Sequence, residues 1–112
     1  MIESGQLNAL AVTSKVRSPV LPNVPTMRQE GLKDYEMVNW WGFFGPAGMA
    51  AQTVARFNQA FSDILKEPET RAKLEKMGYV ITGSTPDEFK AYVKAENDKW
   101  QSVIRSQGLS AQ

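Results

Sequence analysis

The chain has 112 residues, of which 42% are hydrophobic and 22% charged, and its formal net charge is +1. This composition is typical of a single globular domain, and the balanced charge offers no basic footprint for nucleic acid or for an anionic membrane surface. Because the chain contains no cysteine and no histidine, it lacks thiolate nucleophiles, the commonest general base and the commonest metal ligand. An Asp/Glu pair could still act, but none lies in a convincing setting, so we predict no catalytic residue, no metal, no cofactor and no enzymatic activity.

The N-terminal sequence MIESGQLNAL contains no basic segment followed by an apolar one, so we predict no signal peptide within this chain. No apolar run approaches the roughly 20 residues that span a bilayer. The chain is therefore expected either to be cytosolic or to lack its natural leader.

The first predicted element is a buried strand at residues 7–13, LNALAVT, which is short and apolar and follows a Gly-Gln turn signal. Residues 14–25 contain three prolines and are expected to form a loop. Thr26 and Gln29 have the spacing of a helix capping box, and Gly31 suits the position after a helix. These signals predict a helix of about two turns at most.

An aromatic segment, YEMVNWWGFF at residues 35–44, predicts a second strand that ends at GPAG. Side chains alternate across a strand, and both faces of this one would carry apolar groups. A strand covered on both sides is the expected result. Trp40 and Trp41 then have two interpretations: core residues, which is the commoner role of strand aromatics, or residues of a hinge or ligand cleft.

The C-terminal half predicts helices. Apolar residues recur at helical spacing over 50–65, and a second helix is expected to begin at Pro68 and to stop at Gly78. A short strand, YVITG, follows at 79–83. The last helix is expected to run to about residue 106, and its start carries the strongest helix signal of the chain, namely Thr85 as N-cap, Pro86 and Glu88.

The expected fold class is therefore mixed α/β and rich in helix. Three strands that lie far apart in the sequence make a poor sheet by themselves. The sheets are expected to be incomplete, as pieces of larger ones.

Three further motifs could be functional sites, and each also has a structural interpretation. Thr26 in PNVPT either caps a helix after a rigid loop or offers its hydroxyl and the following amides to a carboxylate. GPAGMA lacks the phosphate-loop spacing and is interpreted as a turn. Glu96 and Asp98 are two residues apart on a predicted helix, so they diverge and cannot form an acid/base pair.

An ordered series of motifs nevertheless resembles the Bug receptors, the periplasmic solute-binding proteins of tripartite tricarboxylate transporters. The series begins with SGQLNALAVTSKVRS, LPNVPTMRQEGLKDYE, the pair Trp41-Gly42 and PAG. It continues with RFNQAFSDILKEPETRAKLEKMG and STPDEFKAYVKAENDKWQSVI, so it covers essentially the whole chain. Family members are much longer, which predicts that this chain is the C-terminal portion of such a receptor.

The resemblance implies part of a two-lobed, periplasmic-binding-protein-like fold that closes on a ligand like a Venus flytrap. Residues 1–34 would end one lobe, 35–46 would form an interlobe crossover strand, and 47–112 would pack mainly on the other lobe. The implied function is uptake of small organic acids, with transporter membrane subunits as partners of a periplasmic full-length parent. The implied ligand-binding residues, next to the cleft, are Thr13, Thr26 and Trp41.

A second hypothesis treats the chain as an orphan α/β interaction module with no ligand of its own. Unpartnered apolar strands and the tryptophan pair would then drive formation of a homo-oligomer or a strand-swapped dimer.

Overall fold

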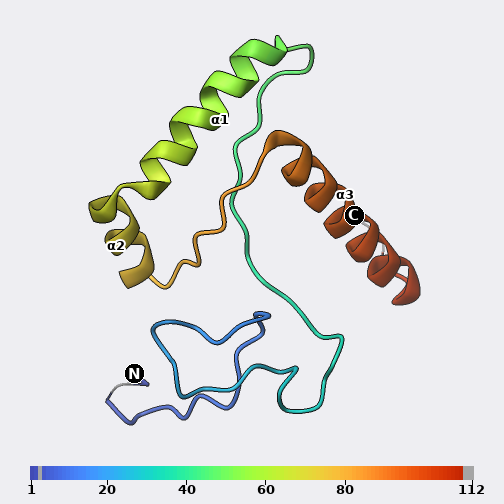
Figure 1. Ribbon diagram of the computed structural model, residues 1–112. Coiled ribbons are helices and arrows are strands. Elements are labelled where there is room, and N and C mark those ends of the chain that lie inside the picture. Colours follow the sequence, from blue (N-terminus) through green and yellow to red (C-terminus); the bar gives the residue numbers. More distant parts are fainter. Residues whose placement is uncertain (3, 110–112) are drawn as a thin grey trace. The chain divides into compact units, whose positions relative to one another are not determined.

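The structure is a computed structural model that describes residues 1–2 and 4–109 (Figure 1). Its regular elements in that range are three helices, α1 (Ala51–Lys66), α2 (Pro68–Lys76) and α3 (Pro86–Ser106). None of these helices, within the described residues, combines the length and apolar character needed to cross a membrane.

Helix α1 confirms the helix predicted from the apolar spacing of 50–65, with each end displaced by one residue. The rings of Phe57 and Phe61 stack one turn apart, with centroids separated by 6.4 Å. The side chain of Asn58 donates to the carbonyl of Ser84 at 2.8 Å. This bond ties α1 to the residue directly before the cap of α3.

Helix α2 begins at Pro68, as predicted, because a proline at the first helical position loses no hydrogen bond. Gly78 follows the helix with a φ of 88°, a left-handed conformation that favours glycine. Its N–H donates to the Glu75 carbonyl at 2.9 Å, and the Tyr79 N–H donates to the Leu74 carbonyl at 3.0 Å. These bonds satisfy carbonyls that would otherwise be left open at the helix end.

Helix α3 has the capping box that the sequence predicts. The Glu88 N–H donates to Thr85 Oγ1 at 3.2 Å, and the Thr85 N–H donates in return to Glu88 Oε2 at 2.8 Å. Pro86 occupies the first helical position. At the other end, Gly108 takes a φ of 63°.

The predicted strands are not formed as paired ladders. Within the described range, residues 7–13, 35–44 and 79–83 contain no strand, and one isolated parallel bridge joins Val12 to Thr26. A single further backbone bond links the first two segments, from the Met37 N–H to the Thr13 carbonyl at 3.0 Å. A strand is stable only when a neighbouring strand pairs with it along its length. In the described range these segments make only this bridge and this one backbone bond, which is too little pairing for a sheet.

The prediction of a short helix after Thr26 was also wrong. Residues 27–31 form consecutive turns, and Gly31 has a φ of 105°. The capping box itself is present, but the glycine ends the structure before a helical turn can be repeated. Nucleating a helix is unfavourable, and so few residues do not compensate for it.

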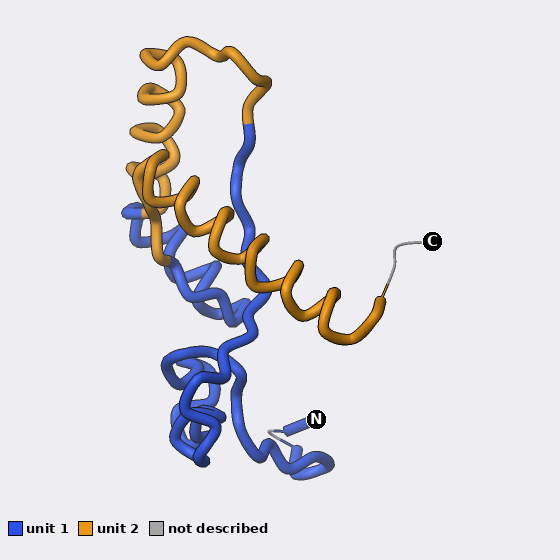
Figure 2. Tube along the Cα trace, turned by 90° about the vertical axis from the view of Figure 1, so that its right-hand side faces the viewer, with its two compact units in different colours: residues 1–44, 66–81 blue, residues 45–65, 82–112 orange. Residues whose placement is uncertain are grey.

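The chain divides into two compact units (Figure 2). One contains Met1–Phe44 and Lys66–Ile81, and the other contains Gly45–Leu65 and the chain from Thr82 onward. Among the described residues no apolar side chain is buried, whereas Thr26 is only 3% exposed. The best-shielded point of the described chain is thus a polar residue in the first unit.

Candidate functional site

Thr26 is fixed by backbone hydrogen bonds of its two chain neighbours and by its own side chain. The Val12 N–H donates to the Pro25 carbonyl at 2.8 Å, and the Met27 N–H donates to the Val12 carbonyl at 2.9 Å. The Thr26 hydroxyl accepts the Gln29 N–H at 3.2 Å. The proline-rich loop therefore returns to the first predicted strand at one fixed point.

Arg17 completes this arrangement. Gln29 Oε1 accepts two hydrogen bonds, from the Thr26 N–H at 3.0 Å and from Arg17 Nε at 3.0 Å. Arg17 Nη1 donates to the carbonyl of Pro22 at 3.2 Å. One guanidinium thus connects the middle of the loop to the turn that follows it.

An open hollow of about 500 Å³ lies beside Thr26. It is lined by Lys15, Val16, Arg17, Thr26, Arg28 and Gln29. Three of these residues are cations and none is an acid, so the hollow favours an anion. Arg28 Nε donates to the Lys33 carbonyl at 2.7 Å, which orients that guanidinium.

The structure places the three predicted ligand-binding residues differently. Thr26 lines the hollow. Thr13 follows the bridge residue Val12, and its carbonyl accepts the Met37 N–H, but it does not line the hollow. Trp41 also lies outside the lining and is 80% exposed. A ligand-binding role for Thr13, Thr26 and Trp41 remains a prediction.

Sequence reasoning did not single out Lys15, Arg17 or Arg28 as site residues. The available signal was the pair of basic residues in SKVRS, followed by the arginine in TMRQEG. Their convergence depends on the turn at Thr26, which brings residues 15–17 to residues 28–29.

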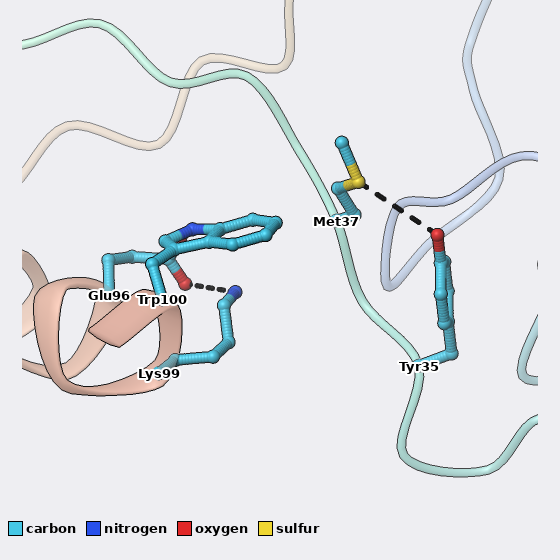
Figure 3. Close-up of polar contacts among 5 residues, drawn as sticks. All are labelled: Tyr35, Met37, Glu96, Lys99 and Trp100. Atoms are coloured by element: carbon cyan, nitrogen blue, oxygen red, sulfur yellow. Dashed lines mark hydrogen bonds and ion pairs between the residues drawn. The ribbon is translucent and has the colours of Figure 1, made fainter. Parts of the chain in front are cut away.

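A second polar cluster lies on α3 and contains Glu96, Lys99 and Trp100 (Figure 3). The indole N–H of Trp100 donates to Glu96 Oε2 at 3.1 Å, and Lys99 donates to Glu96 Oε1. The Lys99 ammonium also lies 5.3 Å from the centre of the Trp100 ring. The hydrogen bond from Lys99 is the main cause of a lowered Glu96 pKa, and the bond from Trp100 acts in the same direction.

This second cluster is not an acid/base site. Asp98 pairs with Lys94 at 2.6 Å, while Glu96 pairs with Lys99, so each carboxylate has its own lysine. The two carboxylates diverge, as their spacing predicts. No group of three or more potential metal-ligating side chains occurs among the residues described.

Comparison with known sequences gives a family match along nearly the whole chain. The family model described as tripartite tricarboxylate transporter family receptor matches residues 1–109. A UPF0065 protein from the tcbD-tcbE intergenic region of Pseudomonas sp. (strain P51) is 33% identical over 107 residues, which are 95% of this chain and 32% of that protein. BugT of Bordetella pertussis is 28% identical over 107 residues, covering 96% of this chain and 33% of BugT.

Solved structures agree with the sequence comparison. The periplasmic binding protein BugD matches 99% of this chain and 38% of its own, with a TM-score of 0.80 and 29% identity. Rpa4515 of R. palustris, solved with adipate, matches 97% of this chain and 36% of its own, with a TM-score of 0.77 and 28% identity. The chain thus spans about a third of the length of these relatives. The predicted fold class, part of an α/β periplasmic-binding-protein fold, is confirmed.

Proposed function

We propose a receptor function from one premise: this chain belongs to the tripartite tricarboxylate transporter receptor family. The family and its solved members are periplasmic solute-binding proteins, so the expectation of a non-enzymatic protein is confirmed. The chain acts in binding a small organic acid, a di- or tricarboxylate or a related anion, for uptake by such a transporter. The full-length parent is periplasmic, and its partners are the transporter membrane subunits.

The observation that carries this proposal is the family match over residues 1–109. A relative solved with adipate, a dicarboxylate, supports the ligand class. Thr13, Thr26 and Trp41 are the proposed contacts. The exposed ring of Trp41 offers a face to the carbon chain of the acid, and the exposed Thr13 offers its hydroxyl to a carboxylate end. Thr26, which is only 3% exposed, would contribute from the edge of the hollow that it lines.

The proposal is tested by joining this chain to the part of BugD that it does not match. Calorimetric titration of the chimera with adipate, succinate and citrate is expected to show binding, whereas the neutral diamide of adipate is expected to show none. A folded chimera, verified by circular dichroism, that binds no carboxylate while intact BugD binds one would overturn the receptor function.

The chain by itself is expected to bind these acids weakly or not at all, because it spans about a third of its relatives. Micromolar binding by the chain alone would contradict that expectation.

A second candidate function is self-association without a ligand. It is favoured by the exposure of large apolar side chains, including Trp41 at 80% and Phe43 at 74%, together with the lack of a buried apolar residue in the described range. Exposed apolar patches commonly mark interaction surfaces. Light scattering is then expected to show a homo-oligomer or a strand-swapped dimer, and a monodisperse monomer at all concentrations would exclude this candidate.

A further inference from the structure

We propose that the hollow beside Thr26 binds a carboxylate group through Lys15, Arg17 and Arg28. The inference rests on the proposed function for its ligand class, a small di- or tricarboxylate. The location of the hollow and its positive charge follow from the residues of this chain alone.

The first argument concerns charge. Among the described residues that line the hollow, Lys15, Arg17 and Arg28 are cationic and none is acidic. Charge-assisted hydrogen bonds to carboxylates are about twice as strong as neutral ones. An anion entering the hollow would therefore meet three donors of the favourable sign.

The second argument concerns the nitrogen donors of Lys15, Arg17 and Arg28 that are not already used in hydrogen bonds. Lys15 Nζ makes no hydrogen bond or ion pair to the described residues. Arg28 uses Nε to reach the Lys33 carbonyl, so its two terminal nitrogens stay outside that bond. Arg17 uses Nε and Nη1, which leaves Nη2. A planar guanidinium that is already oriented loses less entropy when it binds a carboxylate.

The third argument concerns the base of the hollow. Gln29 Oε1 is occupied by Arg17 and by the Thr26 N–H, and the Thr26 hydroxyl accepts the Gln29 N–H. The acceptors that would repel an anion are thus already engaged. Val16 adds an apolar contact for a carbon chain. The hollow is open to solvent, and its volume of about 500 Å³ leaves room for a small carboxylate.

The test is an NMR titration of the whole chain with succinate, with neutral succinamide and with inorganic phosphate in parallel. Succinate is expected to shift the backbone amides of residues 15–17 and 28–29 with millimolar affinity. Succinamide is expected to shift none of them, and phosphate is expected to bind more weakly than succinate.

Variants separate the hollow from general charge effects. The double variant Lys15→Gln, Arg28→Gln is expected to weaken succinate binding roughly tenfold, the loss of about one charge-assisted hydrogen bond. The matched control is the double variant Lys90→Gln, Arg105→Gln, which removes one lysine and one arginine from α3 and is expected to leave the affinity unchanged. Arg17 is kept in both proteins because it braces the loop.

Four results would overturn the inference: binding of succinamide, phosphate binding as tight as succinate binding, an equal loss of affinity in the control double variant on α3, or amide shifts confined to other residues. If the chain alone gives a collapsed amide spectrum, the same titration and variants are applied to the chimera with BugD. A chimera that binds adipate equally well with and without the double variant removes the hollow site and leaves the receptor function standing. Succinate binding at the hollow in a chimera whose cleft binds no carboxylate supports the hollow site and removes the receptor function.

Discussion

Arg17 and Gln29 lie 12 positions apart, and Arg17 Nε donates to Gln29 Oε1 at 3.0 Å. The same oxygen accepts the Thr26 N–H, so one amide group holds both sides of the proline loop. Thr26, next to this shared acceptor, is only 3% exposed, although no apolar side chain in the described range is buried.

Replacing Gln29 tests that role. Gln29→Leu removes the amide acceptor and leaves the shielded Thr26 N–H without its partner. We expect a loss of local stability of roughly 1–3 kcal/mol, as for a shielded donor left unsatisfied. Amide hydrogen exchange at Thr26 and Met27 measures this loss directly.

The control for that substitution is Gln59→Leu, which removes an exposed amide that donates to Asp63 at 2.9 Å within α1. It is expected to leave exchange at Thr26 and Met27 unchanged. Equal effects from the two variants would show that the Arg17–Gln29 bond does not hold the loop.

The capping box of α3 gives the second prediction. Thr85→Ala removes the hydroxyl that accepts the Glu88 N–H, and the expected loss of helix stability is about 1 kcal/mol. Far-UV circular dichroism during urea titration measures it. Thr85→Ser should restore most of the stability because serine is an equally good cap, while Ser102→Ala within α3 should cause no loss. A Thr85→Ala protein as helical as Ser102→Ala would contradict the prediction.

The third prediction concerns pH. Hydrogen bonds from the Thr85 backbone and then from its hydroxyl hold the pKa of Glu88 below its ordinary value, and Lys99 is the main cause of the lowered pKa of Glu96. A group whose pKa is lower in the folded state stabilises that state above its unfolded pKa, and this contribution is lost as the pH falls through the folded pKa. We therefore expect α3 to lose helicity on acidification below the ordinary glutamate pKa of about 4.3.

Circular dichroism from neutral to acidic pH follows this loss. The double variant Glu88→Gln, Glu96→Gln is expected to flatten the profile, since glutamine keeps the capping-box geometry without titrating. Glu36→Gln, outside α3, is the control and should retain the parent profile. A double variant with the same acid transition as the parent would rule out these two carboxylates as its origin.

The fourth prediction concerns the end of α2. Gly78 has a φ of 88°, and a Cβ added there would meet only Val20 Cγ2 at an ordinary 3.9 Å. The penalty of Gly78→Ala therefore comes from the backbone and is expected to be about 1–2 kcal/mol. Gly78→Asn should be milder, because asparagine visits this conformation more readily. Thermal unfolding of the two variants tests the order, and an alanine variant as stable as the parent would contradict it.

Signals carried by adjacent residues predicted the helices well. Pro68 and Gly78 bound α2, and the Thr85–Glu88 box starts α3, because proline geometry, glycine φ and cap hydrogen bonds act within a few residues. The strands were predicted less well because pairing depends on distant neighbours, which the apolar pattern of 35–44 does not specify. The hollow beside Thr26 was missed for the same reason. Thr26 itself was named from its cap signal, but the convergence of Lys15 and Arg28 depends on a turn and not on spacing.

The lack of a buried apolar side chain among the described residues has a calorimetric consequence. The heat-capacity increment of unfolding arises mainly from newly hydrated apolar surface and is about 12–15 cal/mol/K per residue in ordinary globular proteins. This chain, heated alone, should give a much smaller increment and a broad transition in which its helices melt nearly independently. A sharp endotherm with a full increment would appear only when other polypeptide surface covers those side chains.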